Sequence, residues 1–225
     1  MSNIKVIEIK KSVFGSNANQ GNEIRLENKR KKTLFVNLMA SPGAGKTTML
    51  TSLVNSLKDE YKIAIIEADC SSSVDAIKIS DNTGVTSIQI NNDGQCHTDS
   101  FMTKKALDLL ADQHYDLIIL ENIGNLVCPA EFDTGASKNI MILSVPEGDD
   151  KPLKYPLMFT VTDLVIISKM DTIDYFEEFN LNRCIDNIHS RNPISKIIPI
   201  SAKTGMGMDS LINYFKEEIH KWRNE

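Results

Sequence analysis

The sequence predicts an α/β domain with a doubly wound, mostly parallel sheet and helices on both faces. From Thr33 onward, short apolar runs alternate with longer segments of helical periodicity, and this alternation is typical of sheets built from strand–helix–strand units. Several runs are apolar almost throughout, as expected for parallel strands that are buried on both faces. The 225 residues suffice for one large domain with its own core, and a second full domain is not expected.

The expected strands are the short apolar runs, taken in order along the chain. They cover residues 34–39, 63–67, 85–90, 117–121, 140–145, 164–168 and 197–200. Between several of them, apolar residues recur at three- and four-residue intervals, which is the spacing along one face of a helix. These expected helices cover residues 46–57, 102–110, 176–188 and 208–222. Because ligands of such folds bind beyond the carboxyl ends of the strands, the loops at those ends are the first candidates for a site.

Residues 1–32 are expected to form an N-terminal extension, and residues 33–225 the main domain. The extension is interpreted as mobile or packed, and as partly helical. It contains a turn-rich segment at 16–22 and ends in a basic run at 29–32. Such a charge run most often forms a solvated face, so no function is assigned to it.

The composition is that of an ordinary globular protein, with 41% hydrophobic and 24% charged residues. The 25 basic and 30 acidic residues give a net charge of −5, which offers no electrostatic footprint for nucleic acid or an anionic membrane. No apolar run approaches the roughly 18 residues that span a bilayer, and the first residues lack the apolar segment of a secretory signal. Four scattered cysteines do not suggest a disulfide framework. We therefore expect a cytoplasmic protein with reduced thiols.

A glycine-rich segment, A-S-P-G-A-G-K-T-T at 40–48, lies between the first expected strand and a helix. It fits the phosphate-loop pattern G-x-x-x-x-G-K-[ST], except that Ala40 takes the place of the first glycine. Glycines let backbone N–H groups turn toward phosphate oxygens, the lysine bridges the β- and γ-phosphates, and the hydroxyl binds Mg²⁺. The domain is therefore expected to be a P-loop NTPase whose phosphate-binding residues are Gly43, Ala44, Gly45, Lys46, Thr47 and Thr48.

A second motif, Glu121-Asn122-Ile123-Gly124, follows the fourth expected strand. It resembles the D-x-x-G switch of GTPases, with glutamate in place of aspartate. Its carboxylate would hold Mg²⁺ directly or through water, and the Gly124 N–H would sense the γ-phosphate. We expect the catalytic residues to be Lys46, Thr47, Glu121 and Gly124. No glutamine beside Gly124 is available to orient an attacking water, so intrinsic hydrolysis is expected to be slow, and the sequence does not identify the group that positions the water.

The base-binding signal comes from two further strand ends. Ser168-Lys169-Met170-Asp171 resembles the guanine motif N-K-x-D. The Asp171 carboxylate would accept from both donors of guanine, which adenine lacks, and the Lys169 stem would cover the base. Ser168 replaces the usual asparagine, which suggests weaker bracing of the loop. Because a segment resembling the S-A-K motif follows the last strand, we expect GTP or GDP as the nucleotide, bound also by Ser201, Ala202 and Lys203.

A metal-binding constellation is also expected. Cys96 and His97 are adjacent on a polar loop, and Cys128 follows Glu121 within the same short segment. A thiolate and imidazole set suits Ni²⁺ or Zn²⁺. Three ligands leave an open position or require two chains to share the ion across a two-fold axis. The other two cysteines, Cys70 and Cys184, are interpreted as small buried hydrophobic residues.

Together, S-P-G-A-G-K-T, the Cys-His pair, E-N-I-G-N-L-V-C-P-A and E-G-D-D-K-P-L-K-Y-P resemble the HypB family of nickel-insertion GTPases, over about residues 33–222. The resemblance implies a SIMIBI-class GTPase domain at 33–225 and a GTP-dependent homodimer. It further implies that the protein helps load nickel into the large subunit of [NiFe]-hydrogenase, together with other maturation factors. By motif, the shared metal site falls on Cys96, His97 and Cys128, and the Mg²⁺ site on Thr47, Glu121, Asp75 and Asp69.

Some members of that family carry an N-terminal C-x-x-C-G-C site or a histidine-rich tract. This sequence has neither, so no high-affinity N-terminal nickel store is expected.

Other functions remain open at this stage. A related GTPase of urease maturation typically carries Cys-Pro-His, whereas Ala130 follows Cys128 and Pro129 here. A GTPase that protects cobalamin mutases would not need the Cys-His pair. A non-catalytic regulator or a storage module would not need the γ-phosphate contacts of Lys46 and Thr47. The sequence does not decide between Ni²⁺ and Zn²⁺, or whether a dimer needs GTP, metal or both.

Overall fold

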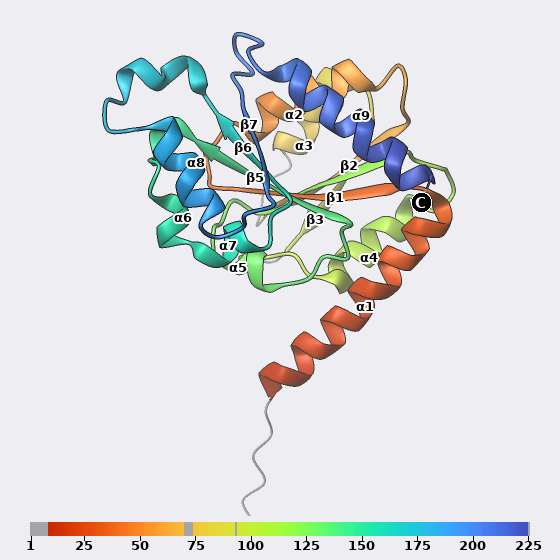
Figure 1. Ribbon diagram of the computed structural model, residues 1–225. Coiled ribbons are helices and arrows are strands. Elements are labelled where there is room, and N and C mark those ends of the chain that lie inside the picture. The colour runs from red at the N-terminus through yellow and green to blue at the C-terminus, as the bar shows by residue number, and fades with distance from the viewer. Residues whose placement is uncertain (1–8, 70–73, 93, 225) are drawn as a thin grey trace, which may run out of the picture.

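A seven-stranded sheet forms the centre of the protein in the computed structural model, which describes residues 9–69, 74–92 and 94–224 (Figure 1). Its strand order is β3-β2-β4-β1-β5-β6-β7, and every neighbouring pair in it is parallel. The doubly wound parallel sheet is therefore confirmed. The strands are β1 (Leu34–Ala40), β2 (Ile63–Asp69), β3 (Thr86–Asn91), β4 (Leu117–Glu121), β5 (Lys138–Ser144), β6 (Leu164–Ser168) and β7 (Lys196–Pro199).

Helices cover both faces of the sheet, because successive side chains of each central strand point to opposite sides. Val36 and Leu38 of β1 pack in one hydrophobic cluster, whereas Phe35 and Met39 enter the two clusters on the other face. The first face is covered by α2 (Lys46–Leu57), α3 (Val74–Thr83) and α9 (Met208–Asn224). The second is covered by α1 (Ile9–Lys31), α4 (Ser100–Leu109), α7 (Pro156–Thr160) and α8 (Leu181–His189).

Helix starts follow from local capping. The side chain of Asp99 caps α4 by accepting from Met102 N. The helix expected from residue 176 begins later, because Asn180 is its cap and accepts from Arg183 N at 2.9 Å. The short remaining helices are α5 (Cys128–Glu131) and α6 (Lys151–Lys154), with the 3₁₀ turns η1 (Val145–Glu147) and η2 (Met170–Tyr175).

The described part of the N-terminal extension forms one long helix, α1, of 23 residues. The turn-rich interpretation of residues 16–22 is wrong, because the helix runs through them. Glycine and asparagine are weak helix formers, but Asn17 is buried and hydrogen-bonded to segments far away in the chain. Tertiary contacts therefore outweigh local propensity in this helix.

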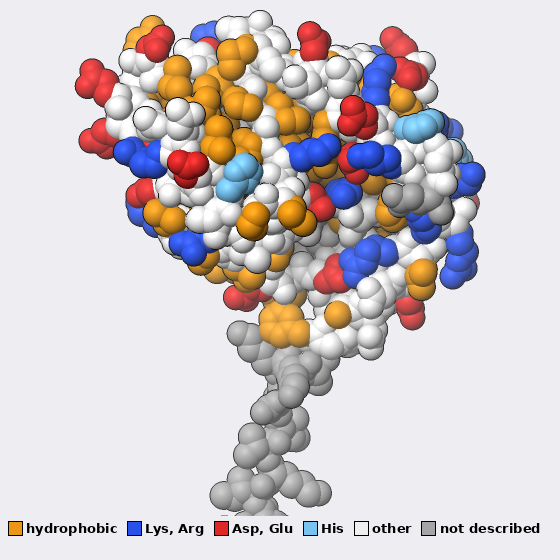
Figure 2. Space-filling view, in the orientation of Figure 1, with side chains coloured by type: hydrophobic (Ala, Val, Ile, Leu, Met, Phe, Trp, Pro, Cys, Tyr) orange, Lys and Arg blue, Asp and Glu red, His pale blue; other side chains and the backbone are white. Residues whose placement is uncertain are grey.

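Charged side chains of both signs are interspersed over the face shown in Figure 2. Within the described ranges, none of the helices has the length and apolar character needed to cross a bilayer.

Candidate functional site

The phosphate loop leaves β1 and enters α2 through two glycines with left-handed backbone. Gly43 has φ 75° and Gly45 has φ 95°, a region that glycine adopts without steric penalty. Gly45 also occupies the N-cap of α2 and makes no side-chain cap. The first backbone N–H groups of α2 are therefore available to an anion, where the helix dipole also favours negative charge.

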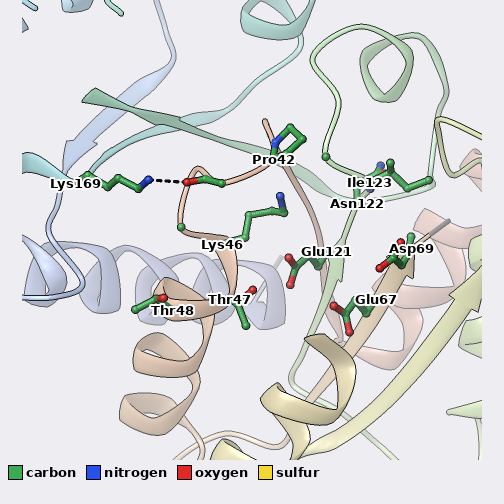
Figure 3. Close-up of a pocket in the computed structure, with 14 residues that line it drawn as sticks. Pro42, Lys46, Thr47, Thr48, Glu67, Asp69, Glu121, Asn122, Ile123 and Lys169 are labelled. Atoms are coloured by element: carbon green, nitrogen blue, oxygen red, sulfur yellow. Dashed lines mark hydrogen bonds between the residues drawn. The ribbon is translucent and has the colours of Figure 1, made fainter. Parts of the chain in front are cut away.

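This loop borders a cavity of about 600 Å³ at the carboxyl ends of the strands (Figure 3). Its lining includes most of the phosphate-loop residues predicted from the sequence, with Lys46, Thr47 and Thr48 among them. Lys46 Nζ lies 3.3 Å from Ser41 O, to which it donates. The structure thus places the predicted phosphate-binding residues around one hollow, except for the side chain of Ala44, which is buried in the core.

Three carboxylates face the same cavity. Glu121 lies at the end of β4 and Glu67 is its register partner on β2, and both are only 4% exposed. Asp69, at the end of β2, also lines the cavity. In Figure 3 Glu121 lies beside Lys46 and Thr47, and Glu67 and Asp69 lie farther from them. Carboxylate and hydroxyl oxygens are the ligands that Mg²⁺ accepts in nucleotide sites, usually one or two carboxylates together with phosphate oxygens, so the residue types present fit this ion.

Glu67 was not predicted as a site residue. The sequence gives one signal for it, a carboxylate inside the otherwise apolar run I-A-I-I-E-A. Such a residue suggests a site, because a buried charge needs a partner or a cation. The side chain of Asp75, which was predicted to contribute to the Mg²⁺ site, lies outside the described part of the structure, as does Cys70.

The switch glycine meets the phosphate loop directly. A Cβ on Gly124 would lie 3.1 Å from Pro42 Cγ and 3.2 Å from Pro42 N, so a larger residue would displace one of the two loops. Two residues earlier, Asn122 is held by β1. Its N–H donates to Leu38 O at 2.9 Å, and its side chain donates to Asn37 at 3.0 Å. The segment after Glu121 is therefore fixed at its start and in contact with the phosphate loop.

The predicted base-binding residues come together around the end of β6. Lys169 adopts φ 60°, and its Nζ donates to Gly43 O at 2.6 Å. Ser168 Oγ donates to Ala44 O at 2.7 Å. The serine therefore still braces the phosphate loop, although it replaces the asparagine of the usual motif.

Asp171 and Ser201 are joined by a hydrogen bond in which Ser201 Oγ donates to Asp171 Oδ1 at 2.7 Å. Met170 N donates to Ile200 O at 3.0 Å and links the same two loops. Ala202 packs against the core, whereas Lys203 is exposed. The two loops predicted to bind guanine are thus one connected structure.

The two predicted cysteine ligands are also brought together. Cys96 Sγ and Cys128 Sγ lie 2.7 Å apart, although 32 positions separate them in the chain. The hydrogen bond with Cys96 and partial burial raise the pKa of the Cys128 thiol. Cys184, in contrast, is fully buried in α8, and burial raises its pKa to about 12. Its interpretation as a structural residue agrees with this position.

His97 does not join the two sulfurs in this arrangement. Its ring stacks on Phe132, with centroids 3.6 Å apart and an interplanar angle of 11°. Burial lowers the pKa of His97, which favours the neutral imidazole that binds metals. Within the described residues, no group of three cysteine, histidine, aspartate or glutamate side chains is arranged to hold an ion. Phe132 was missed, because nothing in the sequence relates it to His97.

A parallel α/β sheet, a phosphate loop after β1 and a lysine–aspartate loop after β6 define a P-loop nucleotide-binding protein. The family model for the "CobW/HypB/UreG, nucleotide-binding domain" matches residues 34–199. The chain belongs to the CobW/HypB/UreG family and, within it, to the HypB proteins. The resemblance indicated by the motifs is therefore confirmed.

Three relatives illustrate this membership. The hydrogenase maturation factor HypB of Rhizobium leguminosarum bv. viciae is 40% identical over 210 residues, covering 93% of this chain and 70% of that protein. The hydrogenase/urease maturation factor HypB of Helicobacter pylori J99 is 39% identical over 219 residues, covering 95% and 88%. The crystal structure of HypB from Helicobacter pylori in complex with nickel has a TM-score of 0.86 and 37% identity, covering 92% of this chain and 96% of that chain.

Proposed function

We propose that the protein is a GTP-hydrolysing metallochaperone that inserts nickel during [NiFe]-hydrogenase maturation. One observation carries the proposal. Glu121 lines the nucleotide cavity, and the same short segment reaches Cys128, whose sulfur lies 2.7 Å from that of Cys96. A residue proposed to hold the Mg²⁺ of the nucleotide and a residue proposed to bind nickel therefore share one loop, which is the arrangement needed to link nucleotide state to metal binding.

The nucleotide end of this function uses the cavity residues. Lys46 would place its charge on the β- and γ-phosphates, and the backbone of Gly43 to Thr48 would surround them. Mg²⁺ would be held by Thr47 and by Glu121, with Glu67 or Asp69 as a second carboxylate, and when bound it neutralises phosphate charge. The Asp75 carboxylate is retained as a further candidate ligand.

Guanine would be bound at the end of β6. Ser201 orients Asp171, so the second carboxylate oxygen and the loop backbone can meet the N1–H and amino donors of the base. The Lys169 side chain donates to Gly43 O of the phosphate loop, and in this position its stem would cover the base. We propose that hydrolysis is slow, because Asn125 and not glutamine follows Gly124, and catalysis would rest on positioned charge.

Nickel is the cargo in this proposal. Cys96, His97 and Cys128 would bind it, with Zn²⁺ as an ion of similar ligand preference. The set is short of four ligands, so we propose that a GTP-dependent homodimer completes the coordination across a two-fold axis. The recipient would be the hydrogenase large subunit, with other maturation factors assisting, and the GTP requirement is consistent with action in the cytoplasm.

A second recipient is favoured by one finding. The Helicobacter pylori relative is named for both hydrogenase and urease maturation. The same nickel-loaded protein would then supply a urease precursor, and the two candidates differ only in the acceptor.

The proposal is tested by measuring nickel transfer. The protein is loaded with Ni²⁺ and mixed with a nickel-free large-subunit precursor or with apo-urease, and the nickel bound to the acceptor is determined after separation. We expect transfer with GTP, and only the level given by free Ni²⁺ with a non-hydrolysable analogue or with the Lys46→Ala variant. Equal transfer in all of these conditions and by Cys128→Ala would contradict the proposed function.

A further inference from the structure

Helix α1 lies against both chain segments that carry the proposed nickel ligands. Ser100 begins α4 directly after the loop of Cys96 and His97, and Asp133 follows α5, which begins at Cys128. We propose that α1 is the positioning element of the cysteine–histidine site, with Asn17 as the residue that bridges the two segments. This inference rests on the proposed function, since it takes that site as the one that binds nickel.

Asn17 uses its entire side chain to make this bridge. It is 3% exposed. Its Nδ2 donates to Ser100 Oγ at 2.8 Å and to Asp133 O at 2.9 Å, and its Oδ1 accepts from Asp133 N at 2.9 Å. Ser100 Oγ donates back to Asn17 O at 2.8 Å. A buried amide with all these partners fixes the separation of the two segments, because losing any one leaves a buried polar group unsatisfied.

The next two turns of α1 contact Asp133 of the Cys128 segment as well. Gly21 and Arg25 follow Asn17 at four-residue intervals, so the three lie on one face of the helix. A Cβ on Gly21 would lie 2.6 Å from Asp133 Cγ, so only glycine lets this carboxylate approach. Arg25 then binds both oxygens of Asp133, at 2.8 and 2.7 Å.

One turn before Asn17, the helix also reaches the imidazole. Phe14 packs on Phe132 with ring centroids 5.1 Å apart, and Phe132 stacks on His97 at 3.6 Å. The orientation of the His97 ring therefore depends on Phe132, a ring of the Cys128 segment, and Phe14 of α1 contacts that ring.

The composition of α1 supports this role. Gly15, Asn17, Asn19 and Gly21 disfavour a helix, and a sequence that breaks local rules commonly does so at a functional site. Asn17 and Gly21 are the two of these that touch the ligand-bearing segments. Outer partners of metal ligands set their orientation, and their loss typically lowers metal affinity about 10- to 100-fold.

The test compares Asn17→Ala with Asn19→Ala, an exposed position on the same helix. The full-length proteins are titrated with Ni²⁺ and followed by thiolate-to-nickel absorption, with circular dichroism and GTP turnover measured in parallel. We expect Asn17→Ala to weaken Ni²⁺ binding about 10-fold or more and to change the shape of the absorption band. Asn19→Ala is expected to match the wild type in both. An Asn17→Ala protein that folds and matches the wild type in affinity and spectrum would overturn the inference.

Two further variants keep this result interpretable. Arg25→Gln removes the partly exposed pair with Asp133 and the Arg25 hydrogen bonds to Ala136 O and Asn22 Oδ1. It leaves Asn17 in place, so it should weaken binding in the same direction even if Asn17→Ala does not fold. Unchanged Ni²⁺ affinity in a folded Arg25→Gln protein, with Asn17→Ala unfolded, would count against α1 as the positioning element. Cys128→Ala reports on the site itself. If it binds Ni²⁺ like the wild type, the proposed function fails; if it loses binding while the α1 variants do not, only the role of α1 fails.

Discussion

At the scale of single residues, Asp171 is the residue that we expect to select the base. Ser201 Oγ occupies one of its oxygens at 2.7 Å, which fixes the carboxylate plane. An asparagine amide at this position would present a donor where guanine also has donors, whereas xanthine has an acceptor there. Asp171→Asn should therefore lower GTP affinity about 10- to 100-fold, the effect of roughly 1–3 kcal/mol for an unpaired buried group, and shift preference toward xanthine nucleotides. Competition titrations with GTP, ATP and XTP measure this, and equal binding of ATP and GTP by the wild type would contradict it.

Lys46 should control turnover rather than folding. Its side chain lines the cavity at the N-terminus of α2, where a positioned charge stabilises the charge of the transition state. We expect Lys46→Ala to lower GTP turnover by about 100- to 1,000-fold. Lys105→Ala, at an exposed position of α4, is the matched control and should retain wild-type turnover. Normal turnover by a Lys46→Ala protein with native circular dichroism would show that hydrolysis occurs elsewhere.

At the scale of elements, three asparagines link the switch segment to the middle of the sheet. Asn122 donates to Asn37 at 3.0 Å, Asn37 donates to Asn139 at 3.0 Å, and Asn139 donates to Val161 O at 3.2 Å. On β1, Asn37 lies between Phe35 and Met39 on the same face, and these two residues belong to different hydrophobic clusters. Each amide polarises the next, which makes a fully satisfied network rigid.

Asn37→Leu keeps the approximate volume and removes the middle of this row. It leaves the buried Asn122 side chain and the partly buried Asn139 side chain each without one partner, at about 1–3 kcal/mol for a buried group. We expect the free energy of unfolding, measured by urea denaturation, to be lower in Asn37→Leu than in the wild type by about 2–6 kcal/mol. Asn55→Leu, on the exposed side of α2, should change stability far less. A similar effect of both substitutions would show that the row has no special role.

A pH-dependent contact joins β2, β4 and α9. Burial alone would raise the pKa of Asp116, but donation from Lys62 N at 2.8 Å and the nearby Arg223 and His114 hold it below its ordinary value of 3.8. A carboxylate with a lowered pKa in the folded state adds stability above its ordinary pKa, and this stability is lost as pH falls through the lowered value. Urea unfolding should therefore show a steeper acid loss for the wild type than for Asp116→Asn. Parallel pH profiles would contradict this expectation.

Most of the fold was predictable because the strands carry their own signal. β4 and β6 were assigned with their observed bounds, since strands buried on both faces are apolar almost throughout. Helix α2 was also predicted with its observed bounds, because its apolar residues recur regularly along one face. The continuity of α1 was not predictable, because its helix depends on contacts of Asn17 with residues more than 80 positions away. The late start of α8 depends on one cap, Asn180.

The candidate site also contains residues that the sequence could predict and residues that it could not. The phosphate loop and the lysine–aspartate loop are short contiguous motifs, so their residues could be named from the sequence. Glu67 and Phe132 act through neighbours that only the folded chain supplies. No local pattern relates β2 to β4 or Phe132 to His97, because these pairs form only through the tertiary fold.

At the scale of the whole molecule, the incomplete ligand set predicts an assembly. Cys96 is exposed and Cys128 half-buried, so the sulfur pair is accessible to a second copy. We expect gel filtration to show a shift from monomer to dimer when GDP is replaced by a non-hydrolysable GTP analogue. The metal content of the dimer should rise with it. A monomer in both nucleotides with Ni²⁺ present would contradict the shared site.

The remaining prediction concerns coupling between nucleotide and metal. Residues 121–130 begin at the cavity with Glu121, touch Pro42 through Gly124 and end in the helix that starts at Cys128. Release of γ-phosphate contacts commonly loosens such a segment in GTPases. With GTP, the segment would hold Cys128 in line with Cys96 and His97, and with GDP the metal geometry would loosen.

Linkage makes this coupling reciprocal: if GTP changes metal affinity by some factor, metal must change GTP affinity by the same factor. A coupling free energy of about 1–3 kcal/mol corresponds to roughly 5- to 150-fold. Ni²⁺ and Zn²⁺ titrations of the wild type and of Cys128→Ala, each with GDP and with a GTP analogue, measure the first factor, and nucleotide titrations with and without Ni²⁺ measure the second. Because the Gly124 contact with Pro42 is the physical link between the two ends, Gly124→Ala should reduce both factors together. Equal metal affinity of both proteins in both nucleotides would rule out the site and its coupling at once.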